Sequence, residues 1–395
     1  MRQRQRLPKT VILLGLTSLF TDVGTEMIFP LLPLFLVETL KASPTYLGLV
    51  EGTADTVAGL LKLASGVIAD AVQRRKPLVL FGYALASAAR PFVAVATRPW
   101  HVLAVRSADR VGKGIRGAPR DALIADAAGD APGRAFGFNQ AMDNAGAVVG
   151  PLLATMLLGL GLALRSVFWL AVIPGAIATV FVAAVAEEPR KAATSLPGVG
   201  TSGSARRPLG RPLVAYLLIL ALFSMGNSSD AFLLLRARSL GFTTESIPLL
   251  WAVLNFSKVL WAYFGGNLAD RMPRVHLIAS GWLVYALVYL GLAAATSPWH
   301  VWILFAIYGV FYGLTEPVEK ALVKDLSSPS TRGRAYGAYN FVVGTTALPA
   351  GLLAGALWRS AGPNVALEVG AGLAAIACLA ILAWDHGRRT RRSRR

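Results

Sequence analysis

Long runs of apolar residues recur from one end of the chain to the other. The runs at 79–89, 151–164 and 371–384 are examples, and they lack the every-second-residue alternation of a barrel strand. Runs of this kind are typical of membrane-spanning helices, which need about 20 apolar residues each. The pattern therefore predicts an all-α integral membrane protein. We expect twelve spans, at roughly 11–37, 46–70, 77–97, 100–121, 135–160, 166–186, 212–236, 245–270, 275–295, 299–322, 335–358 and 364–384.

The composition supports the membrane assignment and narrows the chemistry. Of the 395 residues, 55% are hydrophobic and only 15% are charged, whereas soluble proteins carry about 25% charged residues. A water-soluble enzyme with one central core is thereby excluded. The single cysteine, Cys378, lies inside an apolar run, and the histidines lie at the ends of runs. We therefore expect no metal site, no cofactor and no enzymatic activity.

The formal net charge of +18 has two interpretations. In a soluble protein it would suggest nucleic-acid binding. Here most basic residues lie at the chain ends and between apolar runs on one side, where the positive-inside rule expects them. Contact with membrane lipid is therefore expected, and nucleic-acid binding is not. The side richer in Lys and Arg is taken as cytoplasmic, and an even number of spans then places both termini there. We expect the protein in the cytoplasmic (inner) membrane.

The chain contains an internal repeat with a period of about 200 residues. The segment Gly66-x-x-Ala69-Asp70 with Arg74 returns as Gly266-x-x-Ala269-Asp270 with Arg274. Parallel halves of six spans are a known transporter design. We therefore predict an N-terminal six-helix half (1–186), a cytoplasmic linker (187–211), a C-terminal six-helix half (212–384) and a basic cytoplasmic tail (385–395), in a monomer.

These motifs resemble those of the major facilitator superfamily, and the resemblance covers nearly the whole chain. The family's signature after span 2 is similar to Gly66, Asp70, Arg74 and Arg75, and in the second copy to Gly266, Asp270, Arg271 and Arg274. The antiporter-associated signature of span 5 is similar to Gly146, Gly150 and Pro151, but Ala154 and Thr155 replace its last two glycines.

The resemblance implies a twelve-span transporter of the bacterial drug or metabolite subgroup, working by alternating access. It implies that Asp70 contacts the opposite half when the cytoplasmic side is closed. It also implies a proton-coupling role for Arg110, which matches the arginine of the span-4 signature. A role of the basic loop residues in topology alone stays open.

Charged residues inside the predicted spans are the candidates for function, because a charge at the bilayer centre costs about 2.5–3.5 kcal/mol. Asp22 and Glu26 are four residues apart on one helix face, and two such carboxylates cannot both ionise easily in a dry site. This pair suits proton coupling; neutralisation by basic residues of span 4 is the alternative. The full set of cavity candidates is Asp22, Glu26, Asp55, Asp109, Arg110, Lys113, Asp143, Asn144, Asp230, Lys258, Tyr312, Glu316 and Glu319.

Some of these residues have competing interpretations. Glu51 shares a helix face with Asp55 but is expected near the outer end, so Asp55 is the better interior candidate. Asp230 and Lys258 could form a purely structural pair. The stretch Gly112 to Gly117 fits G-x-G-x-x-G, but it lies within a span and is expected to serve helix packing rather than dinucleotide binding.

The sequence favours a secondary transporter that exports a small polar or charged organic molecule by proton antiport. The partners expected are that substrate, protons and membrane lipid, with the proton gradient as the energy source. A zwitterionic or anionic cargo suits Arg110 and Lys113 as counter-charges. The alternatives are proton-coupled uptake of an organic anion and a non-transporting sensor or lipid scramblase.

Overall fold

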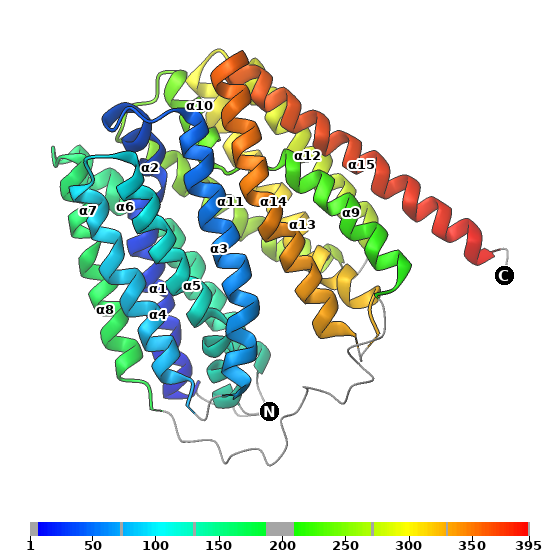
Figure 1. Cartoon of the computed structure of the whole chain (residues 1–395), viewed down its shortest axis with the longest axis horizontal. Helices are drawn as coiled ribbons and strands as arrows, with labels where there is room; N and C mark the ends of the chain where they lie inside the picture. Colours follow the sequence, from blue (N-terminus) through cyan, green and yellow to red (C-terminus); the bar gives the residue numbers. More distant parts are fainter. Residues whose placement is uncertain are drawn as a thin grey trace. The chain divides into compact units, whose positions relative to one another are not determined.

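The computed structural model describes residues 7–71, 74–128, 132–186, 209–269, 272–328 and 331–393. Within these ranges all regular structure is helical (Figure 1). The elements are α1 (Lys9–Ile28), η1 (Phe29–Leu31), α2 (Leu32–Leu34), η2 (Phe35–Thr39), α3 (Pro44–Ala71), α4 (Lys76–Ala89), η3 (Arg90–Val95), α5 (Pro99–Ala128), α6 (Pro132–Gly159), α7 (Leu164–Leu170), α8 (Val172–Ala183), α9 (Arg211–Gly226), α10 (Ala231–Ser239), α11 (Ser246–Ala269), α12 (Arg274–Ala294), α13 (Pro298–Asp325), α14 (Arg332–Ala361) and α15 (Pro363–Ser393).

The helices confirm the predicted all-α membrane architecture. Among the described residues, nine helical segments are long and apolar enough to cross a membrane. The other three predicted spans correspond to α3, α5 and α11, which are 28, 30 and 24 residues long. Of these, α5 carries the charged side chains Arg106, Asp109, Arg110 and Lys113.

The chain divides into two compact units. Unit 1 contains Met1–Leu32 and Val57–Val199, and unit 2 contains Pro33–Thr56 and Gly200–Arg395. The first half of α3 thus groups with the later helices. Residues 187–208, most of the predicted linker, lie outside the described residues. In the predicted tail, α15 continues as a helix to Ser393.

Unit 1 is held together by apolar helix faces. Helix α1 packs along α6 and α8, and α4 packs along α5 and α8. A cluster that includes Leu14, Val79, Tyr83 and Ile124 is fully buried between these helices. Burying such side chains contributes about 1.5–3 kcal/mol each in water, but in lipid close packing replaces the hydrophobic effect as the main source of association.

Unit 2 has an aromatic core. Helix α11 packs along α13, α12 packs along α13 and α15, and α9 packs along α14 and α15. Trp282, Tyr285 and Tyr308 are fully buried. The ring of Phe223 stacks on that of Trp282 with centroids 4.5 Å apart. These rings fix the faces of α9, α12 and α13 on which the polar residues of unit 2 lie.

The seventh predicted span is broken into α9 and α10. Residues Asn227, Ser228 and Ser229 are non-helical, and Asp230 precedes the first residue of α10. Asn, Ser and Asp side chains compete with the backbone for hydrogen bonds, which makes a run of them a local helix breaker. Asp230 therefore lies at the break, immediately before the first residue of α10.

Candidate functional site

The crossing of α1 and α6 in unit 1 is built by two glycines. A Cβ at Gly146 would lie 2.5 Å from the carbonyl oxygen of Leu19 and 2.8 Å from Cβ of Asp22. A Cβ at Gly150 would lie 2.6 Å from the carbonyl oxygen of Val23 and 2.9 Å from Cβ of Glu26. Such small residues let helix backbones approach closely in membranes. The two glycines of the span-5 motif therefore press against the two turns of α1 that carry Asp22 and Glu26.

Asp22 is half-buried and has no hydrogen-bond donor among the described residues. The charged groups that act on its carboxyl are Asp143, Lys113, Glu26 and Arg116. Taking up a proton would break no short hydrogen bond to this carboxyl.

Lys113 stands at the middle of the 30-residue α5 and its side chain is exposed. It lies within electrostatic range of Arg110 and Asp22. A lysine that faced hydrocarbon at this depth would cost about 2.5–3.5 kcal/mol. This cost disfavours a position of the Lys113 ammonium against lipid.

Asp109 belongs to a different class of carboxylate. It is 3% exposed, and its Oδ1 accepts a hydrogen bond from Arg90 Nε at 2.7 Å. Arg106 Nη1 lies 3.9 Å from Oδ2, and Arg90 Nη1 also donates to the carbonyl oxygen of Thr21 at 3.1 Å. Two buried cations hold Asp109 as a fixed charge that ties η3 to α5 and α1. Its role in the structure is that of an internal ion pair.

Asp143 joins α1, α5 and α6 in a polar network. Asn139 Nδ2 donates to Asp143 Oδ2 at 3.2 Å, and Arg120 Nη1 lies 4.0 Å from the same oxygen. Arg120 Nη1 also donates to Ser18 Oγ at 3.1 Å, and Ser18 Oγ donates to Asn139 Oδ1 at 3.3 Å. Asn144 accepts a hydrogen bond from Gln140 on its own helix at 3.3 Å. The network lies against the turn of α1 that precedes Asp22.

The burial of the span-2 carboxylates is the reverse of the sequence expectation. Glu51 is only 2% exposed, whereas Asp55 is exposed. On the same helix Gly48 packs against the backbone of Gly351, and Thr56 Oγ1 donates to the carbonyl oxygen of Gly344 at 2.7 Å, so α14 contacts α3 on both sides of this pair. Periodicity alone shows a shared face, but not which end of it a neighbouring helix covers.

Asp230 is the centre of the polar cluster in unit 2. Its Oδ2 accepts from Tyr312 Oη at 2.6 Å and lies 3.4 Å from Lys258 Nζ. Its Oδ1 accepts from Tyr308 Oη at 3.0 Å. The expected Asp230–Lys258 pair is thus present, and Tyr308 and Tyr312 from one face of α13 join it. The Lys258 ammonium also lies 4.9 Å from the ring centroid of Trp251.

Glu319 forms a second buried site on α13. It is 6% exposed and accepts hydrogen bonds from Tyr339 Oη at 2.9 Å and from Trp282 Nε1 at 3.3 Å. Both donors are neutral. Glu316, one turn earlier, is exposed.

The predicted gating motifs are described only in part. The side chains of Gly66, Asp70 and Gly266, and the whole of Asp270 and Arg271, lie outside the described residues. Of the remaining motif residues, Arg74 is exposed, whereas Arg75 and Arg274 form ion pairs.

The two ion pairs repeat one another. Arg75 Nη1 lies 2.7 Å from Asp126 Oδ2 near the end of α5, and Arg274 pairs with Asp325 at the end of α13. By its ion pair, Arg274 corresponds to Arg75. The sequence repeat had aligned Arg274 with Arg74 instead. The second loop is one residue shorter between the aspartate and the paired arginine.

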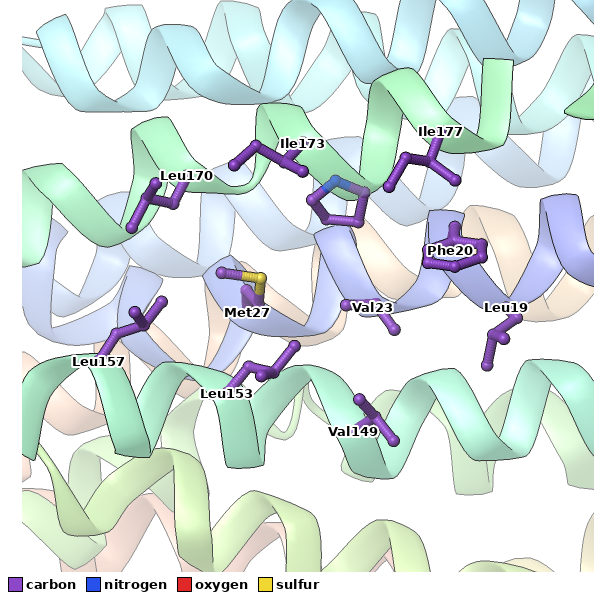
Figure 2. A pocket seen from close by; sticks show the side chains of 11 residues that line it. Leu19, Phe20, Val23, Met27, Val149, Leu153, Leu157, Leu170, Ile173 and Ile177 are labelled. Atoms are coloured by element: carbon purple, nitrogen blue, oxygen red, sulfur yellow. The ribbon is translucent and has the colours of Figure 1, made fainter. Parts of the chain in front are cut away.

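An apolar cavity of about 380 Å³ lies in unit 1 between α1, α6, α7 and α8 (Figure 2). It is lined by Leu19, Phe20, Val23, Met27, Val149, Leu153, Leu157, Leu170, Ile173, Pro174 and Ile177. No side chain in this lining can form a hydrogen bond to a polar ligand. None of the candidate polar residues lines it.

Sequence reasoning missed several residues of these sites. It did not single out Arg90, which holds Asp109, or Trp251, which contacts Lys258. An arginine before Pro91 inside an apolar run was a usable signal for Arg90. The glycines Gly112 and Gly114 behave as expected: added Cβ atoms would collide with Gly82 of α4 and Leu61 of α3, which identifies them as packing residues. Among the described residues no cluster of three or more metal-ligating side chains occurs.

Comparison with known proteins identifies the family. The sequence profile of the Major Facilitator Superfamily matches residues 14–261 and 218–395. The chain belongs to this superfamily. An uncharacterised MFS-type transporter of Methanocaldococcus jannaschii is 32% identical over 385 residues, which are 96% of this chain and 95% of that protein.

Two further similarities are with a solved structure and with a shorter stretch of a transporter sequence. The crystal structure of the nucleoside transporter NupG aligns with a TM-score of 0.81 over 95% of this chain and 99% of that one, at 14% identity. The multidrug resistance protein MdtH of Yersinia enterocolitica is 38% identical over 73 residues, 18% of each chain. As a member of the Major Facilitator Superfamily, the chain is a multi-pass membrane transporter of small molecules.

Proposed function

We propose that this major facilitator exports a small polar or charged organic molecule in exchange for protons. The observation that carries the proposal is that two aspartates of unit 1, Asp22 and Asp109, have different neighbours. Asp109 is held by two buried arginines, whereas Asp22 has no donor among the described residues and lies beside Lys113 and Asp143. Only the second arrangement allows a proton to bind and leave during a transport cycle.

The close crossing of α1 and α6 couples this carboxyl to helix movement. Gly146 and Gly150 bring the α6 backbone against the turns of Asp22 and Glu26. A small shift of α6 therefore changes the distance between Asp143 and Asp22. Because like charges disfavour each other's ionised form, such a shift would favour or oppose proton binding.

The antiport direction rests on the partial span-5 motif, Gly146, Gly150 and Pro151. The stretch of identity with a multidrug resistance protein agrees with export. The excess of basic residues in the loops on one side supports a cytoplasmic location of both termini in the inner membrane.

The test uses purified protein in two steps. A thermal-shift screen against metabolites and drugs at two pH values identifies ligands. Each ligand is then applied to proteoliposomes that contain a pH-sensitive dye. We expect ligand-evoked proton movement opposite to ligand flux, and we expect Asp22→Asn to abolish it while ligand binding in detergent persists.

Asp385→Asn is the matched control, since Asp385 lies on α15 beyond the twelfth predicted span and pairs only with Arg389 in the described chain. Proton movement in the same direction as the ligand would replace antiport by symport. Undiminished proton movement in Asp22→Asn would remove the coupling role of this carboxyl.

A further inference from the structure

The cluster around Asp230 has the chemical composition of a binding site for an organic cation. The Lys258 ammonium lies 3.7 Å from the ring centroid of Tyr312, 4.9 Å from that of Trp251 and 3.4 Å from Asp230 Oδ2. A cation held between aromatic faces and one carboxylate is how proteins recognise ammonium ligands. In this structure the cation in that place belongs to the protein itself.

The carboxylate of this site does not depend on the lysine for its position. Tyr312 Oη donates to Oδ2 at 2.6 Å and Tyr308 Oη donates to Oδ1 at 3.0 Å. The Tyr308 ring is in turn stacked on Phe311 with centroids 5.6 Å apart. Asp230 would therefore keep its orientation if the Lys258 side chain moved away.

The cluster is also accessible. The side chain of Lys258 is 23% exposed and that of Asp230 is 11% exposed. The break between α9 and α10 places Asp230 at the first turn of α10. Withdrawal of the four-carbon lysine side chain would vacate a space shaped for an alkylammonium group, with aromatic rings on its walls.

We propose that this cluster is an organic-cation subsite in which Lys258 acts as a tethered competitor. A substrate ammonium group displaces the Lys258 ammonium from Asp230, Tyr312 and Trp251, and the lysine swings toward the water to which it is already exposed. The inference rests on the proposed transport function and names its substrate class: a small organic molecule with one ammonium group and an apolar part.

The opposite assignment would make Lys258 the counter-charge for an anionic substrate. The geometry disfavours it, because the Asp230 carboxylate lies 3.4 Å from the ammonium and would repel a second anion. The faces of Tyr312 and Trp251 carry negative potential and would also repel one. An organic cation meets attraction from all three groups.

The experiment compares two probes of the same shape and opposite charge, 2-phenylethylammonium and 3-phenylpropionate. Their binding to the purified full-length chain in detergent at pH 8 is measured by isothermal titration calorimetry. We expect Lys258→Met to bind the ammonium probe at least about tenfold more tightly than the parent chain. The factor reflects the fraction of molecules in which the lysine occupies the site.

Adding Asp230→Asn to Lys258→Met should then weaken ammonium binding at least about tenfold, without leaving an unpaired lysine in the cluster. Lys324→Met is the matched control, since Lys324 is exposed at the end of α13. Lys258→Gln replaces Lys258→Met if the latter does not fold.

Two results would overturn the inference: ammonium binding that is absent or no tighter in Lys258→Met, and loss of 3-phenylpropionate binding in that variant. Binding in detergent involves no proton gradient. Failure of proton antiport would therefore leave this measurement unaffected, and failure here would leave antiport intact.

Discussion

Three glycines of α6 provide a direct test of the close α1–α6 crossing. Replacing Gly137, Gly146 or Gly150 by alanine makes the same chemical change in the same helix. A Cβ at Gly137 meets nothing within 4 Å, whereas one at Gly146 would lie 2.5 Å from the Leu19 carbonyl oxygen. Carbon–oxygen contacts normally stay at about 3.3 Å or more, so α6 must withdraw from α1 by roughly 0.8 Å in the Gly146 variant.

The expected magnitudes follow from two opposing effects. Alanine favours a helix over glycine by about 1 kcal/mol, and this gain is common to all three positions. Overpacking costs about 1–3 kcal/mol and arises only at Gly146 and Gly150. We therefore expect Gly137→Ala to raise the free energy of unfolding by up to about 1 kcal/mol. Gly146→Ala should be less stable than Gly137→Ala by about 1–3 kcal/mol.

The assay is unfolding of the purified variants in one detergent, followed by ligand-evoked proton movement in proteoliposomes. The Gly146 variant should also show altered proton coupling, because the α1 turn that shifts carries Asp22. If Gly146→Ala proves as stable as Gly137→Ala and couples protons normally, the close crossing does not constrain the carboxyl and the reasoning fails.

Two further substitutions separate buried from exposed polar groups. Asp109→Ala should lower the free energy of unfolding by about 3–5 kcal/mol, because it leaves Arg90 buried without its partner. Asp121→Ala, whose partner Arg120 is more exposed, should lose only about 0–1 kcal/mol, and equal losses in the two variants would contradict this assignment. Glu319→Gln should change the unfolding free energy by less than about 1 kcal/mol, since the amide oxygen can accept from Trp282 Nε1 while the amide NH2 donates to Tyr339 Oη after that hydroxyl has turned. A loss above about 3 kcal/mol in a thermal or denaturant titration would instead indicate an ionised Glu319.

The spans could be predicted because membrane crossing is a local property of the chain. A helix in lipid satisfies its own backbone hydrogen bonds, so about 20 apolar residues suffice to mark it. The same locality explains why α5 and its charged face were recognised despite a composition that fails a simple hydropathy criterion. The Asp230–Lys258 pair was also within reach, because an intramembrane charge needs an opposite charge nearby.

The distinction between candidate residues was beyond the sequence. Asp22 and Asp109 are both aspartates within predicted spans, and nothing in their spacing shows that Arg90 of η3 reaches one and not the other. Glu51 and Asp55 share a face of α3, yet only Glu51 is buried. Partners that lie far apart in the chain cannot be inferred from periodicity.

The amino-acid sequence by itself determined the class of protein, the twelve predicted spans, the repeat and the set of charged residues within those spans. These properties depend on neighbouring residues and on the low dielectric constant of lipid. Only the tertiary structure decided which carboxylates are held by a cation, as Asp109 is by Arg90, and which have no hydrogen-bond donor in the described part of the chain, as with Asp22. The environment of each carboxyl depends on atoms within a few ångströms of it. A single Cβ atom in a helix contact, or an arginine distant in the sequence, changes that environment.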